Sequence, residues 1–154
     1  METQKIEEFY LIGIALPFKT SNANGQSAID CGSLWQQFEK GNYQAQIPNK
    51  LGNEVFAVYH DYEGDYTLPY AYFIGCKVDP NTPVPIGLTS LTIPSANYSK
   101  LTAKGKMPDC VANAWHRIWK SDLPRAYRPD FEIYDERSLD WSNAEVDIYL
   151  STSH

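Results

Sequence analysis

One order of predicted elements occurs twice along the chain, and this repeat restricts the possible folds more than any other feature. Residues 9–78 read as strand, helix, strand, strand, and residues 88–152 read in the same order. LWQQF at 34–38 aligns with AWHRI at 114–118, and FAVYHD at 56–61 aligns with FEIYDE at 131–136. A duplicated unit predicts a molecule with pseudo-two-fold symmetry. The alternative is chance similarity within a mixed α+β chain.

The first copy begins with a β-prone run, FYLIGIALPFK at 9–19. A helix is predicted at 27–40, because Leu34, Trp35 and Phe38 fall on one helical stripe. The copy ends at the segment DPNTP, whose two prolines are predicted to interrupt regular secondary structure. Its remaining elements are predicted strands at 55–62 and 70–78.

The second copy opens with an extended run at 88–93 that continues toward Leu101. Asp109 directly follows Pro108 and is the predicted N-cap of a helix, which Pro124 is predicted to stop. An apolar stripe supports this helix: Val111, Ala114, Trp115, Ile118 and Trp119. The last two predicted strands are 130–135 and 145–152.

These elements predict one α+β domain over 1–154, built of duplicated βαββ modules at about 9–80 and 86–152. A module with one helix on three strands is too small to bury its own core. Two modules packed together can bury both cores, and the seam between them is a natural place for a ligand cleft.

Charge and hydropathy exclude several classes of protein. The chain has 13 Lys and Arg against 19 Asp and Glu, a formal net charge of −6, which does not suit direct binding to nucleic acid. No apolar run is long enough to cross a membrane. The N-terminal METQKIEEF lacks the apolar segment of a signal peptide, so a cytoplasmic protein without a membrane partner is expected.

Aromatic residues are abundant, with 11 Tyr, 6 Phe and 4 Trp. Such a composition suits a tyrosine-rich sheet core, and it also suits a pocket for flat or cationic ligands. From composition alone the core interpretation is favoured. Three widely spaced cysteines, Cys31, Cys76 and Cys110, are expected to be free thiols. No metalloprotease, serine hydrolase, P-loop or dinucleotide motif occurs, so no metal or cofactor is expected.

Five segments together resemble the GyrI-like effector-binding domain, in the stand-alone bacterial form of integron-associated effector-binding proteins. They are VFAVYHDYEGDY at 55–66, YFIGC at 72–76, WHRIW at 115–119, DFEIY at 130–134 and EVDIYL at 145–150. The resemblance implies two βαββ modules around a cleft that binds lipophilic cations against aromatic rings and one buried Glu. The matching Glu is Glu132. The first family-like strand begins near Phe9, so no DNA-binding helix-turn-helix is expected before it, and a separate regulatory protein is a candidate partner.

Strand alternation supports Glu132 independently of the resemblance. Glu132 and Tyr134 share one face of their strand, and Ala57 and Tyr59 share the equivalent face of the matching strand. The pseudo-dyad would bring these four residues to one cleft. Alternatively, Glu132 is a solvated residue on the open face of the sheet.

The helices and the last strand supply the other candidate ligand-binding residues: Trp35, Trp115, Trp119 and Tyr149. Each tryptophan on an inner helix face either belongs to the core or lines the cleft. The acidic residues Asp61, Glu63 and Asp65 are only candidates for its rim.

The sequence is compatible with three functions. The favoured one is a small-molecule binding protein that captures lipophilic, cationic aromatic compounds and is not an enzyme. The second is a hydrolase of strained cyclopropane-bearing compounds with Glu132 as general base. The third is a protein-interaction role such as topoisomerase modulation.

Overall fold

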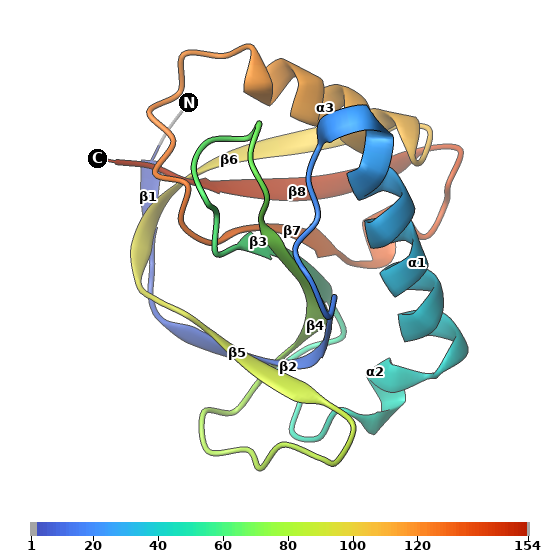
Figure 1. The fold of residues 1–154 in the computed structure, drawn as a ribbon. Coiled ribbons are helices and arrows are strands. Elements are labelled where there is room, and N and C mark those ends of the chain that lie inside the picture. Colours follow the sequence, from blue (N-terminus) through green and yellow to red (C-terminus); the bar gives the residue numbers. More distant parts are fainter. Residues whose placement is uncertain (1–2, 154) are drawn as a thin grey trace.

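Eight antiparallel strands form one curved sheet in the computed structural model, which describes residues 3–153 (Figure 1). The strands are β1 (Thr3–Ile6), β2 (Phe9–Ala15), β3 (Val55–His60), β4 (Ala71–Val78), β5 (Thr89–Ile93), β6 (Ala96–Gly105), β7 (Asp130–Tyr134) and β8 (Ala144–Ser151). The helices are α1 (Gln26–Lys40), α2 (Tyr43–Gln46) and α3 (Asp109–Trp119), with 3₁₀ turns η1 (Ala23–Gly25) and η2 (Glu136–Ser138). No helix among the described residues is long and apolar enough to cross a membrane.

The strand order shows the two-fold arrangement directly. The sheet reads β1-β6-β8-β7-β3-β4-β2-β5. Its six central strands therefore form two sets of three that are related by a pseudo-two-fold axis. The order equates β2 with β6, β3 with β7 and β4 with β8, and it equates α1 with α3. The pseudo-dyad passes between β3 and β7, where Ala57 lies opposite Glu132. The predicted α+β fold with duplicated βαββ modules is confirmed.

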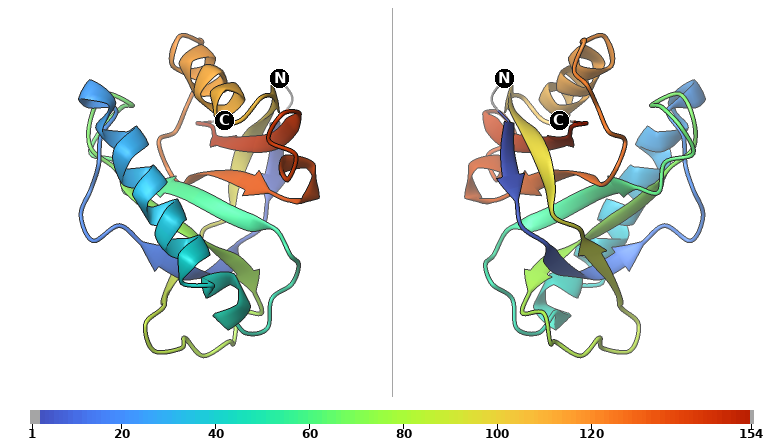
Figure 2. Two further views of the ribbon diagram at one scale, coloured as in Figure 1. Left: turned by 90° about the vertical axis from the view of Figure 1, so that its right-hand side faces the viewer. Right: turned by 90° about the vertical axis from the view of Figure 1, so that its left-hand side faces the viewer.

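The first strand of each half is exchanged with the other half. β1 pairs with β6, and β5 pairs with β2. Ile6 lies opposite Ala96 and Phe9 lies opposite Ile93. The segment β1–β2 therefore pairs with the segment β5–β6 in one continuous antiparallel register. This pairing curls the sheet, as Figure 2 shows from two sides.

The exchange changes the strand correspondence expected from the sequence and adds a strand to the first half. The strand at 88–93 is the counterpart of β1, whereas the true counterpart of β2 is the next strand, β6. Strand β1 itself was not predicted, because its residues TQKI are mostly exposed and carry no apolar alternation.

The start and end of α3 also differ from the prediction. Pro108 is the N-cap, and Asp109 is the first helical residue without a side-chain capping bond. There the carboxylate of Asp109 still interacts favourably with the helix dipole. The helix ends at Trp119, before Pro124 is reached.

Three hydrophobic clusters stabilise the fold. Leu34 and Phe38 of α1 pack on β2, β3 and β4, and Ala114 and Ile118 of α3 pack on β6 and β8. The third cluster fills the concave interior of the sheet and contains Phe9, Phe56, Phe131 and Tyr98. The three cysteines are free, and Cys76 and Cys110 are buried.

We expect the close approach of β2 and β4 to tolerate no side chain. Gly13 lies opposite Gly75, and a Cβ atom at Gly13 would overlap the backbone of Ile74. Gly13→Ala should therefore lower the free energy of unfolding by about 1–3 kcal/mol, measured by urea denaturation. Gly32→Ala is the control, because this exposed helical site has nothing within 4 Å of the new Cβ atom. It should be neutral or stabilising, and equal losses in both variants would contradict the explanation.

Candidate functional site

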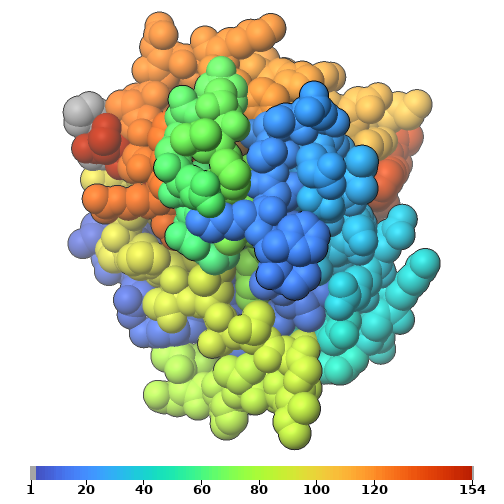
Figure 3. Space-filling model, in the orientation of Figure 1, coloured from blue at the N-terminus to red at the C-terminus, as the bar shows by residue number. Residues whose placement is uncertain are grey.

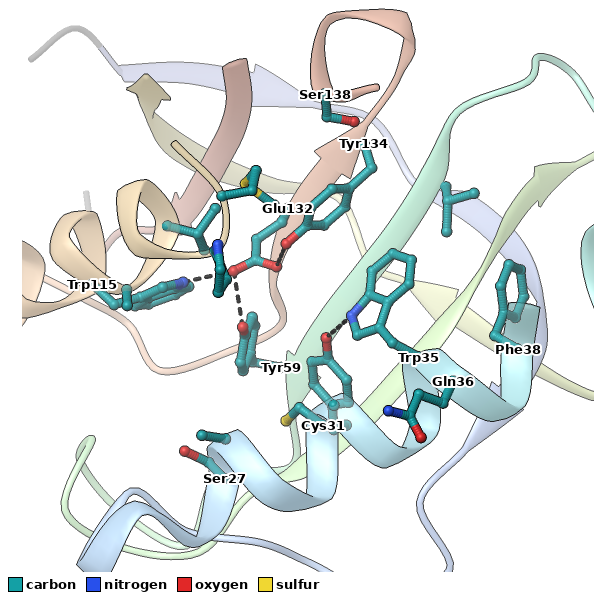
Figure 4. Close-up of a pocket in the computed structure, with 18 of the residues that line it drawn as sticks. Ser27, Cys31, Trp35, Gln36, Phe38, Tyr59, Trp115, Glu132, Tyr134 and Ser138 are labelled. Carbon is teal, nitrogen blue, oxygen red and sulfur yellow. Dashed lines mark hydrogen bonds between the residues drawn. The ribbon is translucent and has the colours of Figure 1, made fainter. Parts of the chain in front are cut away.

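A cavity of about 1480 Å³ lies across the seam between the two halves. Helices α1 and α3 form its sides, and β3, β4 and β7 contribute side chains to its floor (Figure 4). At one end, the loop after β3 lies against the start of α1, as the space-filling view shows (Figure 3). Asn22 holds this loop by donating a side-chain hydrogen bond to the carbonyl oxygen of Tyr66 at 2.8 Å.

Glu132 is the central polar group of the cavity and is 1% exposed. Its Oε2 atom accepts hydrogen bonds from Trp115 Nε1 at 2.6 Å and from the Tyr59 hydroxyl at 2.8 Å. Its Oε1 atom accepts a bond from the Tyr134 hydroxyl at 2.6 Å. These donors come from α3, β3 and β7, so the carboxylate joins the two halves of the molecule.

All three partners of Glu132 are neutral. Within residues 3–153, no Lys, Arg or His forms an ion pair with this carboxylate. Burial raises the pKa of Glu132 above its ordinary value of 4.5, and the bonds from Tyr134, Trp115 and Tyr59 oppose that rise. A buried carboxylate without a counter-ion is costly, and such groups concentrate at functional sites.

Five rings surround this carboxylate, and we call them the aromatic box: Trp35, Tyr59, Tyr72, Trp115 and Tyr134. The Tyr59 ring centre lies 4.9 Å from that of Trp115 and 5.0 Å from that of Tyr72. The centre of Trp35 lies 4.8 Å from that of Tyr134. Trp35 Nε1 donates to the Tyr72 hydroxyl at 2.8 Å, which fixes the wall on the side of α1.

Burial, with the nearby Glu132 charge, raises the pKa of Tyr59 and of Tyr134 well above 10. Both hydroxyls therefore stay protonated and act as donors at neutral pH. Both residues line the cavity, and their O–H groups point at the carboxylate.

A second buried carboxylate lies behind Trp115 and is neutralised. Asp130 accepts a bond from Arg125 Nη2 at 2.8 Å and from the Tyr62 hydroxyl at 2.6 Å. The Arg125 guanidinium lies 5.6 Å from the Trp115 ring centre. Because Arg125 already has an anionic partner, it does not cancel the charge of Glu132.

Six of the eight predicted ligand-binding residues line the cavity: Glu132, Tyr134, Tyr59, Trp115, Trp119 and Trp35. Trp119 lies on the same cavity wall and stacks on Tyr66, with ring centres 5.5 Å apart and planes 7° apart. Ala57 is fully buried opposite Glu132 and does not line the cavity.

Tyr149 lies on the opposite face of the sheet. Its ring stacks on Phe131 at 5.0 Å, because its neighbours Ile148 and Leu150 face α3 and alternation turns Tyr149 away. The predicted placement of Tyr149 in the cleft is therefore wrong. The acidic rim candidates also lie elsewhere, since Asp61 and Glu63 pair with Lys19 at the surface and Asp65 bonds Thr67.

Several cavity residues were not predicted: Cys31, Tyr62, Tyr66, Tyr70 and Tyr72. Alternation could have identified Tyr72, because it shares the face of Ile74 and Cys76 under α1. Cys31 lies one helical turn before Trp35, a spacing that also places it on the inner face.

Removing the charge of Glu132 should change how stability depends on pH. The folded-state pKa lies above 4.5, so above that pH the folded protein binds more protons than the unfolded chain. Stability from this group is therefore lost as pH rises from about 4.5 through the folded-state pKa. Glu132→Gln should lack this loss, and urea denaturation of both proteins from pH 4.5 to 8 tests it. Identical pH profiles would contradict a raised pKa.

Comparison with known proteins gives consistent results. The family model for integron-associated effector binding proteins matches residues 3–151. YobU of Bacillus subtilis (strain 168), named as a transcriptional regulator protein, is 25% identical over 123 residues, which are 77% of each chain.

Two solved structures share the fold. SAV2435 bound to tetraphenylphosphonium superposes with a TM-score of 0.78 at 18% identity, covering 97% of this chain and 92% of SAV2435. An integron cassette protein from the mobile metagenome of Vibrio cholerae superposes with a TM-score of 0.70 at 24% identity, covering 97% and 94%. The resemblance inferred from the five sequence segments is thus confirmed, and the chain belongs to the family of integron-associated effector binding proteins.

Proposed function

We propose that the protein captures lipophilic, cationic aromatic compounds, with Glu132 as the counter-charge. The observation that carries this proposal is a fully buried carboxylate with three neutral donors and no basic partner among residues 3–153. A delocalised cation would supply the missing positive charge without having to donate a hydrogen bond. Ring faces around it would add cation–π contacts of about 0.5–2 kcal/mol each.

The other charged side chains of the cavity favour the same class of ligand. Glu39, Glu54 and Glu136 line it, while its one arginine, Arg125, is paired with Asp130. The field inside the cavity is therefore negative, which attracts cations and repels anions. The tetraphenylphosphonium bound by SAV2435 is a lipophilic aromatic cation and supports this ligand class.

The proposed ligand-binding residues are Glu132 and its donors, together with Trp35 and Trp119. In this proposal the protein works in the cytoplasm and binds no nucleic acid itself. A separate regulatory protein would convert ligand capture into a transcriptional response.

Glu132→Gln keeps the shape of the side chain and removes the charge. We expect the variant to bind tetraphenylphosphonium about 10- to 150-fold more weakly, corresponding to about 1.5–3 kcal/mol of charge–charge attraction at an effective dielectric constant of about 20. Binding of neutral triphenylphosphine oxide should change much less. Isothermal titration calorimetry of both proteins with both compounds measures the difference. Equal affinities of the two proteins for the cation would contradict the assigned role of Glu132.

The same variant tests the hydrolase alternative, in which the Glu132 carboxylate is the general base. Incubation with a cyclopropane-bearing substrate would then release product with the wild type and not with Glu132→Gln. Binding without product is the outcome expected from the proposed function.

Cation affinity should rise with pH, because only the ionised form of Glu132 attracts the ligand. The rise should lie above pH 4.5, since burial raises the pKa of this carboxyl. Tyr134→Phe removes one bond that stabilises the carboxylate, so it should move the rise to higher pH. Fluorescence titrations from pH 4.5 to 8 measure both curves. A curve of Tyr134→Phe at the same or lower pH would contradict this explanation.

A further inference from the structure

The cavity extends beyond the aromatic box, along apolar side chains that a charged head group at Glu132 would not contact. Met107, which precedes α3, and Val111 in its first turn line it, together with Leu139 and Trp141 from the segment after η2. We call these four residues the apolar groove. Figure 4 shows Ser138 beyond the Tyr134 ring, on the segment that leads from β7 toward this groove.

The groove is continuous with the site at Glu132. Met107 and Val111 pack in the same hydrophobic cluster as Trp115 and Tyr134, so apolar contacts connect the two regions, and Asp135, Glu136 and Ser138 line the cavity beside them. Leu139 and Trp141 are nevertheless 78% and 60% exposed. Because these exposed apolar side chains also line the cavity, a ligand in the cavity could cover them.

Hydrogen bonds hold both walls of the groove in place. The Met107 N–H donates to the carbonyl oxygen of Trp141 at 2.7 Å, which ties the two walls together. Arg137 bonds Asp135 at 3.0 Å and Asp147 at 2.7 Å, and so anchors η2 to β8. The backbone that carries Leu139 and Trp141 is therefore held in place, so binding an apolar group does not require this segment to become ordered.

The cavity is also larger than a compact cation requires. Its volume of about 1480 Å³ exceeds the roughly 300–1000 Å³ that is usual for a small-molecule site. A head group at Glu132 would leave the end of the cavity at Leu139 unfilled. Met107 suits a variable apolar ligand, because its unbranched thioether adapts to different shapes.

We propose that the apolar groove takes a flexible alkyl arm of an amphiphilic cation whose charged head lies at Glu132. This inference rests on the proposed function and specifies its ligand class further, as an aromatic ammonium head with an apolar arm. Burying each additional methylene group of the arm strengthens binding by up to about fourfold.

The test uses benzyldimethylbutylammonium and benzyldimethyloctylammonium below their micelle concentrations, with affinities measured by isothermal titration calorimetry. Wild type should bind the octyl compound at least tenfold more tightly than the butyl compound. The double variant Leu139→Gln/Trp141→Gln should reduce this ratio to about threefold or less. Both sites are exposed, so the variant should fold normally.

The matched control is Ile86→Gln, which changes a fully exposed apolar residue in the loop between β4 and β5, away from the two long helices (Figure 1). It should keep the wild-type ratio. An unchanged ratio in the double variant, an equal loss in the control, or a wild-type ratio near one would each overturn the inference. Failure of the proposed function is recognised separately, because Glu132→Gln would then bind the butyl compound as tightly as wild type does.

Discussion

The organisation of the cavity depends on the burial of the Glu132 carboxylate without a basic partner among residues 3–153. Three hydrogen bonds from neutral donors reduce the cost of burying this carboxylate and do not remove its charge. The donors belong to β3, β7 and α3, so the same three bonds hold the two halves in their relative positions. Burial of this charge costs stability, as the raised pKa of Glu132 also indicates, and in the proposed function the same charge would attract the ligand.

The pseudo-dyad explains how a duplicated fold produces a site with a single charge. Tyr59 and Tyr134 occupy equivalent positions in the two halves, and both donate their hydroxyl hydrogens to Glu132. The position equivalent to Glu132 is Ala57, which lies directly opposite it in the sheet. A second carboxylate there would repel the first across the strand pair, whereas alanine leaves space and adds no charge.

The two tryptophans at equivalent positions have also taken different partners. Trp115 donates to Glu132, whereas Trp35 donates to the Tyr72 hydroxyl and contacts Tyr134 edge-on. The tryptophan of one half therefore stabilises the carboxylate, and the tryptophan of the other half supplies a neutral aromatic wall. Behind Trp115, Arg125 pairs with Asp130, so this second buried carboxylate adds no uncompensated charge near Glu132.

The sequence by itself determined the α+β class, the duplicated order of elements and the helices that contain Trp35 and Trp115. It also placed Glu132, Tyr134 and Tyr59 on one face, because side-chain alternation in a strand depends only on the local backbone. Alternation does not tell which face another element covers, and for this reason Tyr149 was wrongly placed. Tyr72 was missed although its alternation with Ile74 and Cys76 indicates the face under α1. The exchange of β1 and β5 between the halves, and the joining of Glu132 to donors from three elements, depend on contacts between residues far apart in the chain. Only the tertiary structure decided these features, because a local pattern carries no information about the partner of a strand or of a buried charge.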